Sequence, residues 1–132
     1  MGKTILILLS TFALVVGSAV ASTVVPKTGA WKGQTAGTTF TFSIAKQGKT
    51  EKVTSIEAGT FRLSCGTKPL FSLLNVATTK VLANGSFKVV QKFNGGSATV
   101  TGRFTGKTKA TGSIVVDIAG LCKSSYPWSA SR

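Results

Sequence analysis

Apolar and polar side chains alternate with a period of two along most of this chain, and no segment keeps the 3.6-residue period of an amphipathic helix. In residues 38–46, Phe40, Phe42 and Ile44 fall on one face, while threonine and serine fall on the other. Because successive side chains of a strand point to opposite faces of a sheet, this alternation predicts strands with one buried face. The pattern recurs in residues 59–65, 87–93, 98–105 and 111–118.

Short strands separated by turn signals predict an all-β fold with about seven or eight antiparallel strands. Asn84-Gly85 is typical of a two-residue hairpin turn, and Asn94-Gly95-Gly96 indicates a second tight turn. A lone open sheet could not bury the phenylalanine-rich faces, so we expect a single antiparallel β-sandwich. The alternative is a small up-and-down β-barrel, because Trp31-Lys32-Gly33 followed by alternating phenylalanines resembles the opening of some lipocalin-like and avidin-like barrels.

The start of the chain is typical of a secretion signal. A lysine precedes an apolar run over residues 5–17, and a small-x-small tripeptide of the kind that signal peptidase cleaves ends at Ala21. We therefore expect residues 1–21 to be a signal peptide and residues 22–132 to be a secreted domain. The alternative is an uncleaved membrane anchor, because residues 5–25 carry no charge and are long enough to span a bilayer. Either way we expect the domain to be extracytoplasmic, secreted or associated with the cell envelope.

Two cysteines, Cys65 and Cys122, lie inside the expected secreted domain. In an oxidising compartment two such cysteines normally form a disulfide. The alternative is a pair of free redox thiols, but the two residues do not form a Cys-x-x-Cys motif. The sequence therefore predicts a Cys65–Cys122 disulfide.

The charge composition excludes several kinds of active site. The chain has 16 Lys and Arg residues, 3 Asp and Glu residues and no histidine, which gives a formal net charge of +13. A chain without histidine cannot form a Ser-His-Asp triad or a His-ligated zinc site. The three acids, Glu51, Glu57 and Asp117, leave little material for a two-carboxylate hydrolase or a calcium site. We expect no enzyme activity, no cofactor and no metal.

Basic residues gather on the outward positions of the C-terminal strands, among threonines. An electropositive face of this kind attracts anionic polymers, such as wall polymers, acidic polysaccharides or anionic lipid headgroups. It predicts no specific nucleic acid, because attraction to phosphate needs only Lys and Arg. The alternative is a solvated face that keeps a secreted protein soluble. The candidate polyanion-binding residues are Lys88, Lys92, Arg103, Lys107 and Lys109.

Three aromatic residues fall outside the strict alternation. They are Trp31, which precedes the first alternating segment, and Tyr126 and Trp128, which follow Cys122. Flat aromatic rings stack on sugar faces, so the three are candidate glycan contacts. The alternative is that the tryptophans plug an end of the fold, with residues 120–127 as a loop held by the disulfide.

Several short motifs occur in a fixed order in the second half of the chain. They are Asn84-Gly85-Ser86-Phe87, Val100-Thr101-Gly102-Arg103-Phe104, Ala110-Thr111-Gly112-Ser113, Cys122 and Trp128-Ser129-Ala130-Ser131-Arg132. In this order they resemble a group of small secreted bacterial proteins of unknown function. The resemblance implies an exported, β-rich domain with a disulfide, and it implies no catalytic or binding residues.

The function predicted from the sequence is non-catalytic binding of an anionic polymer or surface glycan at the cell envelope or outside the cell. A membrane contact is expected only if the N-terminal segment stays uncleaved. The alternative is a secreted protein–protein interaction module or inhibitor. The two differ in salt dependence, because binding through several lysines weakens steeply with ionic strength. The sequence does not indicate an oligomeric state.

Overall fold

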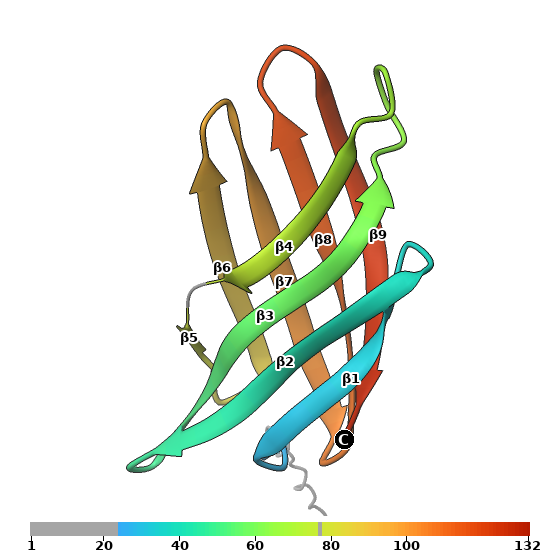
Figure 1. Ribbon diagram of the computed structural model, residues 1–132. Coiled ribbons are helices and arrows are strands. Elements are labelled where there is room, and N and C mark those ends of the chain that lie inside the picture. Colours follow the sequence, from blue (N-terminus) through green and yellow to red (C-terminus); the bar gives the residue numbers. More distant parts are fainter. Residues whose placement is uncertain (1–23, 77) are drawn as a thin grey trace, which may run out of the picture.

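The computed structural model describes residues 24–76 and 78–132. Within them the chain forms one antiparallel sheet of nine strands and no helix (Figure 1). The strands are β1 (Gly29–Thr35), β2 (Thr38–Gln47), β3 (Thr50–Arg62), β4 (Leu70–Val76), β5 (Thr79–Lys80), β6 (Ser86–Phe93), β7 (Gly96–Gly106), β8 (Lys109–Ile118) and β9 (Cys122–Ser131).

The sheet consists of two meanders joined into one. The strand order is β4-β3-β2-β1-β9-β8-β7-β6, so the pairing of β1 with β9 connects the first half of the chain to the second. The two halves face each other across a common interior (Figure 1). The all-β antiparallel prediction is confirmed. The expected two-sheet sandwich is wrong, however, because the strands form one continuous sheet. The architecture is the alternative that the sequence offered, a small barrel, and this barrel is not fully closed.

The remaining gap lies between β4 and β6, which are the two ends of the strand order. Near one end of the gap, β5 pairs with β3, and the Thr79 hydroxyl donates to the carbonyl oxygen of Lys88 on β6 at 2.9 Å. Elsewhere the rings of Phe71 and Phe93 meet with centroids 5.8 Å apart. Side chains and a short strand thus cover the gap without a continuous backbone ladder.

Aromatic rings fill the interior of the barrel. Trp31 stacks on Phe42 with centroids 5.5 Å apart and meets the edge of Phe104 at 5.1 Å. Trp128 stacks on Phe40 at 4.6 Å. All five rings are buried, and such pairs add about 0.5–1.5 kcal/mol each beyond their burial. Other positions expected to face inward are also buried, among them Ile44, Phe61, Leu63, Phe87, Val89, Ala98, Val100, Ile114 and Val116.

Two glycines make room for Trp128. Gly102, Gly112 and Trp128 occupy one cross-strand row on β7, β8 and β9. A Cβ atom on Gly102 would lie 2.5 Å from both Trp128 and Phe87, and one on Gly112 would lie 2.7 Å from Trp128. The absence of a side chain at these two positions lets the indole pack closely against β7 and β8.

One local expectation holds in part and two are wrong. Asn84-Gly85 forms the expected tight turn, because the Gly85 amide donates to the Leu82 carbonyl at 2.9 Å and the Leu82 amide donates to the Ser86 carbonyl at 2.8 Å. The turn does not join two paired strands, however, since β5 pairs with β3. Residues 120–127 are not a loop, because β9 begins at Cys122. Phe93, expected to face inward, is 37% exposed at the end of β6, where only the ring of Phe71 meets it across the gap.

The expected signal peptide, residues 1–21, lies outside the described residues. Within the part of the chain that the structure describes, no helix is long and apolar enough to cross a membrane.

Candidate functional site

All five predicted polyanion-binding residues are exposed on the outer face of the barrel or at its turns. Arg103 pairs with Ser86, and Lys88, two residues further along β6, pairs with Thr101. Lys88 and Arg103 are therefore diagonal neighbours, about 7–8 Å apart at Cα. The structure brings these two together.

The rest of the predicted set is spread along the strands. Lys92 pairs with Ser97 at the start of β7, whereas Lys107 follows the end of β7. At about 3.3 Å per residue, those two ends of β7 lie about 33 Å apart. The five residues thus form a line along the barrel and not one compact site.

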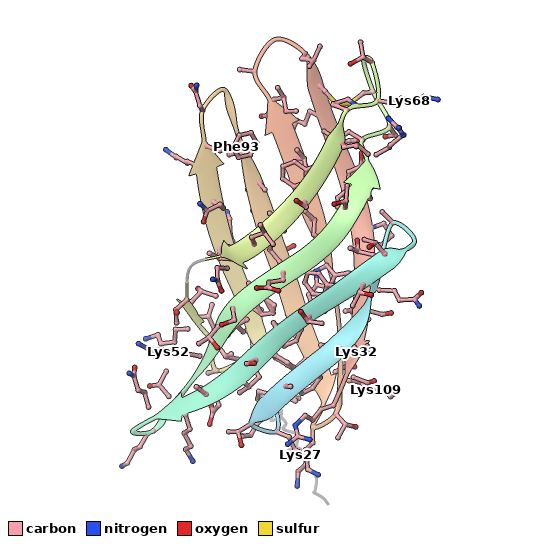
Figure 2. The ribbon with its side chains drawn as sticks, in the orientation of Figure 1. Lys27, Lys32, Lys52, Lys68, Phe93 and Lys109 are labelled. Carbon is pink, nitrogen blue, oxygen red and sulfur yellow. A yellow bond between two sulfur atoms is a disulfide. The ribbon has the colours of Figure 1, made fainter. Side chains whose placement is uncertain are left out.

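A compact basic group does occur at the end of the barrel that contains Lys107 and Lys109. The Lys27 amide donates to the Lys107 carbonyl at 3.0 Å, and the Arg132 amide donates to the Thr108 carbonyl at 3.1 Å. Figure 2 shows Lys27, Lys32 and Lys109 in this lower part of the molecule, with Lys68 and Phe93 at the opposite end. We call this group the basic end; it consists of Lys27, Lys32, Lys107, Lys109 and Arg132, all exposed.

Backbone hydrogen bonds and two side-chain hydrogen bonds hold the basic end in place. The Trp31 indole in the core donates to the Lys27 carbonyl at 2.9 Å, which fixes the segment before β1. Arg132 Nε donates to the Thr28 carbonyl at 2.7 Å, which ties the guanidinium to the same segment. Three parts of the chain that are far apart in sequence therefore meet at one place.

A shallow depression lies beside the basic end on the outer face of β1, β9 and β8. Two cross-strand rows of side chains line it. The first row is Lys32–Ser131–Lys109, and the second is Gln34–Ser129–Thr111. Its remaining lining residues are Gly33, Thr105, Ala110 and Ala130, so the lining contains no acidic residue.

The three acidic residues are far from one another on the sheet. Glu57 on β3 pairs with Thr41, which in turn pairs with Lys32. Asp117 on β8 pairs with Lys123 at the other end of the barrel, and Glu51 pairs with Lys46. No two of the three acids are cross-strand partners.

The three candidate glycan contacts are corrected by the structure. Trp31, Tyr126 and Trp128 are 0%, 8% and 3% exposed. The indole nitrogens are also occupied, since Trp31 donates to Lys27 and Trp128 donates to the Thr101 carbonyl at 3.1 Å. These rings face the interior because their strands present alternate residues inward, so they form no surface on which a sugar could stack.

The disulfide end of the barrel carries a small polar cluster. Cys65 and Cys122 form the predicted disulfide, with Cα atoms 5.6 Å apart. Beside it, the Tyr126 hydroxyl accepts from the Ser64 amide at 2.8 Å, and the Ser64 and Ser124 hydroxyls are 2.6 Å apart. Burial raises the pKa of Tyr126, but hydrogen bonds with Ser124 and Ser64 together outweigh it and lower the pKa below its ordinary value of 10.0.

Sequence reasoning missed three members of the basic end, Lys27, Lys32 and Arg132. Lys27 and Lys32 lie outside the C-terminal strands that drew attention to the other basic residues, and Arg132 follows the last of those strands. The pairing of β1 with β9 brings Lys32 to Lys109, and that pairing has no local signal in the sequence. The only hint in the sequence was that basic residues occur near both ends of the expected secreted domain.

Among residues 24–76 and 78–132, no three His, Cys, Asp or Glu side chains gather as a metal site would require. No family model, curated protein or solved structure matches this chain.

Proposed function

We propose that this protein is an exported, non-catalytic binder of anionic polymers at the cell envelope or outside the cell. The observation that carries the proposal is the basic end, where five exposed cationic side chains meet beside a depression whose lining contains no acidic residue. Glu57 lies in the same cross-strand row as Lys32, two strands away. Five cations against this one acid still raise the local concentration of polyanions and speed their association. Lys88 and Arg103 extend the positive surface along the barrel.

The disulfide supports the extracytoplasmic part of the proposal. Disulfides persist in oxidising compartments and are rare in the reducing cytosol. The Cys65–Cys122 disulfide is consistent with export, as is the apolar N-terminal segment of the sequence.

A second candidate function is binding of a protein partner, and the gap between β4 and β6 favours it. Edge strands can pair with an added strand, and apolar side chains are exposed along both edges. Leu70 and Leu74 on β4 are 62% and 75% exposed, and Val90 on β6 is 45% exposed.

Co-sedimentation of the full-length protein with isolated cell envelopes, at low and at high salt, separates the two functions. Polyanion binding predicts retention at low salt that is lost at high salt, because released counterions drive it. In a matched sample, soluble inorganic polyphosphate should compete with the cell envelope for the protein and lower its retention. Retention that is indifferent to salt and to polyphosphate would contradict the proposal and favour the protein partner.

A further inference from the structure

We infer that the depression between Lys32 and Lys109 is a subsite for a tetrahedral oxyanion ester, phosphate or sulfate, carried by a polyol or sugar polymer. The inference rests on the proposed function and narrows it to one place and one kind of ligand. It joins Lys109, which the sequence pattern singled out, to Lys32, which the pattern did not.

The first row places two cations around one hydroxyl. Lys32 on β1 and Lys109 on β8 both pair with Ser131 on β9, so all three side chains point to the same outer face. With strands about 4.8 Å apart, the two lysine Cα atoms are about 10 Å apart. Two flexible four-carbon stems can close that distance onto a single anion, with the Ser131 hydroxyl between them.

The second row supplies neutral donors and acceptors. Gln34, Ser129 and Thr111 are cross-strand partners two residues further along the same three strands. The two rows are therefore about 7 Å apart, so side chains from both rows can contact one polymer unit. An anionic group on the first row would place its polyol or sugar on the second.

The side chains suit a tetrahedral anion. The bidentate fork of arginine recognises carboxylate and phosphate alike, whereas lysine binds phosphate as a point charge and needs no planar partner. The two cations that line the depression are both lysines. The remaining members of the basic end, Lys27, Lys107 and Arg132, lie beside it and can contact the next charged units of the polymer.

Matched variants of the full chain test the subsite. K32Q/K109Q and K88Q/K92Q each remove two exposed positive charges, one pair from the depression and one from β6. Binding is measured by calorimetry to a glycerol-phosphate polymer, to dextran sulfate and to polygalacturonate. We expect K32Q/K109Q to weaken binding of the first or second polymer by about tenfold or more, and K88Q/K92Q to weaken it by about threefold or less.

Comparison of the affinities for the three polymers identifies the anionic group that the subsite binds. Preference for the glycerol-phosphate polymer or for dextran sulfate identifies the ester as phosphate or sulfate. Polygalacturonate binding that depends equally on Lys32 and Lys109 would overturn the tetrahedral assignment. Circular dichroism melting of each variant confirms that the exposed substitutions leave the fold intact.

One further double variant tests the neutral row. Q34A/S129A should weaken binding of the glycerol-phosphate polymer and leave binding of inorganic polyphosphate, which has no polyol, unaffected.

Equal losses of affinity for K32Q/K109Q and K88Q/K92Q would overturn the subsite while leaving polyanion binding in place. Absence of binding to every polymer at low salt would overturn the proposed function and the subsite together.

Discussion

Gly102 shows how one missing side chain controls the packing of the core. Its position opposite Gly112 and beside Trp128 leaves no space for a Cβ atom, which would contact both Trp128 and Phe87. Gly106 lies on the same strand, and a Cβ atom there would have no neighbour within 4 Å. The two glycines differ in their surroundings and share their strand.

We predict that Gly102→Ala lowers the free energy of unfolding by about 1–3 kcal/mol, because overpacking forces the buried rings apart. Gly106→Ala should change it by less than about 0.5 kcal/mol, as expected of a substitution that contacts nothing. Urea unfolding of both variants gives the comparison. Equal costs would show that Trp128 does not depend on the glycine row.

Tyr126 is the single tyrosine of the chain, so its ionisation can be followed directly. Its folded pKa lies below the ordinary value of 10.0 because Ser124 and Ser64 hydrogen-bond to the hydroxyl. We predict that the ultraviolet absorbance of tyrosinate rises with a midpoint below pH 10 in the folded protein. In urea the midpoint should move up to the ordinary value.

The same shift has a consequence for stability. A folded pKa below the unfolded one stabilises the fold above the unfolded pKa, and this contribution is lost as the pH falls through the folded pKa. The stability of the natural protein relative to Tyr126→Phe should therefore increase as the pH rises towards 10.0. A folded midpoint at or above that of the unfolded chain would contradict the hydrogen bonding described for Ser64.

The disulfide connects elements that the sheet leaves apart. Cys65 lies in the connection between β3 and β4, Cys122 begins β9, and the two are 57 residues apart in sequence. No strand pairing joins β4 to β9 in the sheet order. The disulfide therefore ties the two halves of the barrel together at the end opposite the basic end.

We predict that Cys65→Ala with Cys122→Ala lowers the free energy of unfolding by about 4 kcal/mol, because the unfolded chain regains a long open loop. Urea titration measures the loss, and reduction of the natural protein in urea should produce the same loss. Two free thiols in the intact mass of the non-reduced protein would contradict the disulfide itself.

Strands that alternate strictly could be predicted from the sequence, and irregular strands could not. Residues 38–46 and 98–105 show their inward face as a row of apolar side chains. In β3, by contrast, Ser55 has a positive φ of 52°, and this bulge lets Val53 and Ile56, three residues apart, both point inward. In β9 the serines and Pro127 obscured an alternation that the burial of Tyr126 and Trp128 makes plain.

At the scale of the whole molecule, the closure of the barrel decides where the charges meet. The pairing of β1 with β9 turns two meanders into one sheet and places Lys32 beside Lys109. Local sequence patterns predicted the strands and the positive charge. They could not predict the basic end, because its segments, residues 27–32, 107–109 and 132, are brought together only by long-range strand pairing.

The central claim is that the positive charge of the basic end binds an anionic polymer. The most direct test is the affinity of the full chain for the glycerol-phosphate polymer, measured by calorimetry over a range of salt concentrations. The claim predicts that the logarithm of the association constant falls linearly with the logarithm of salt, with a slope of about −3 or steeper, and that K32Q/K109Q reduces the slope by about 2. An affinity that does not change with salt would contradict it.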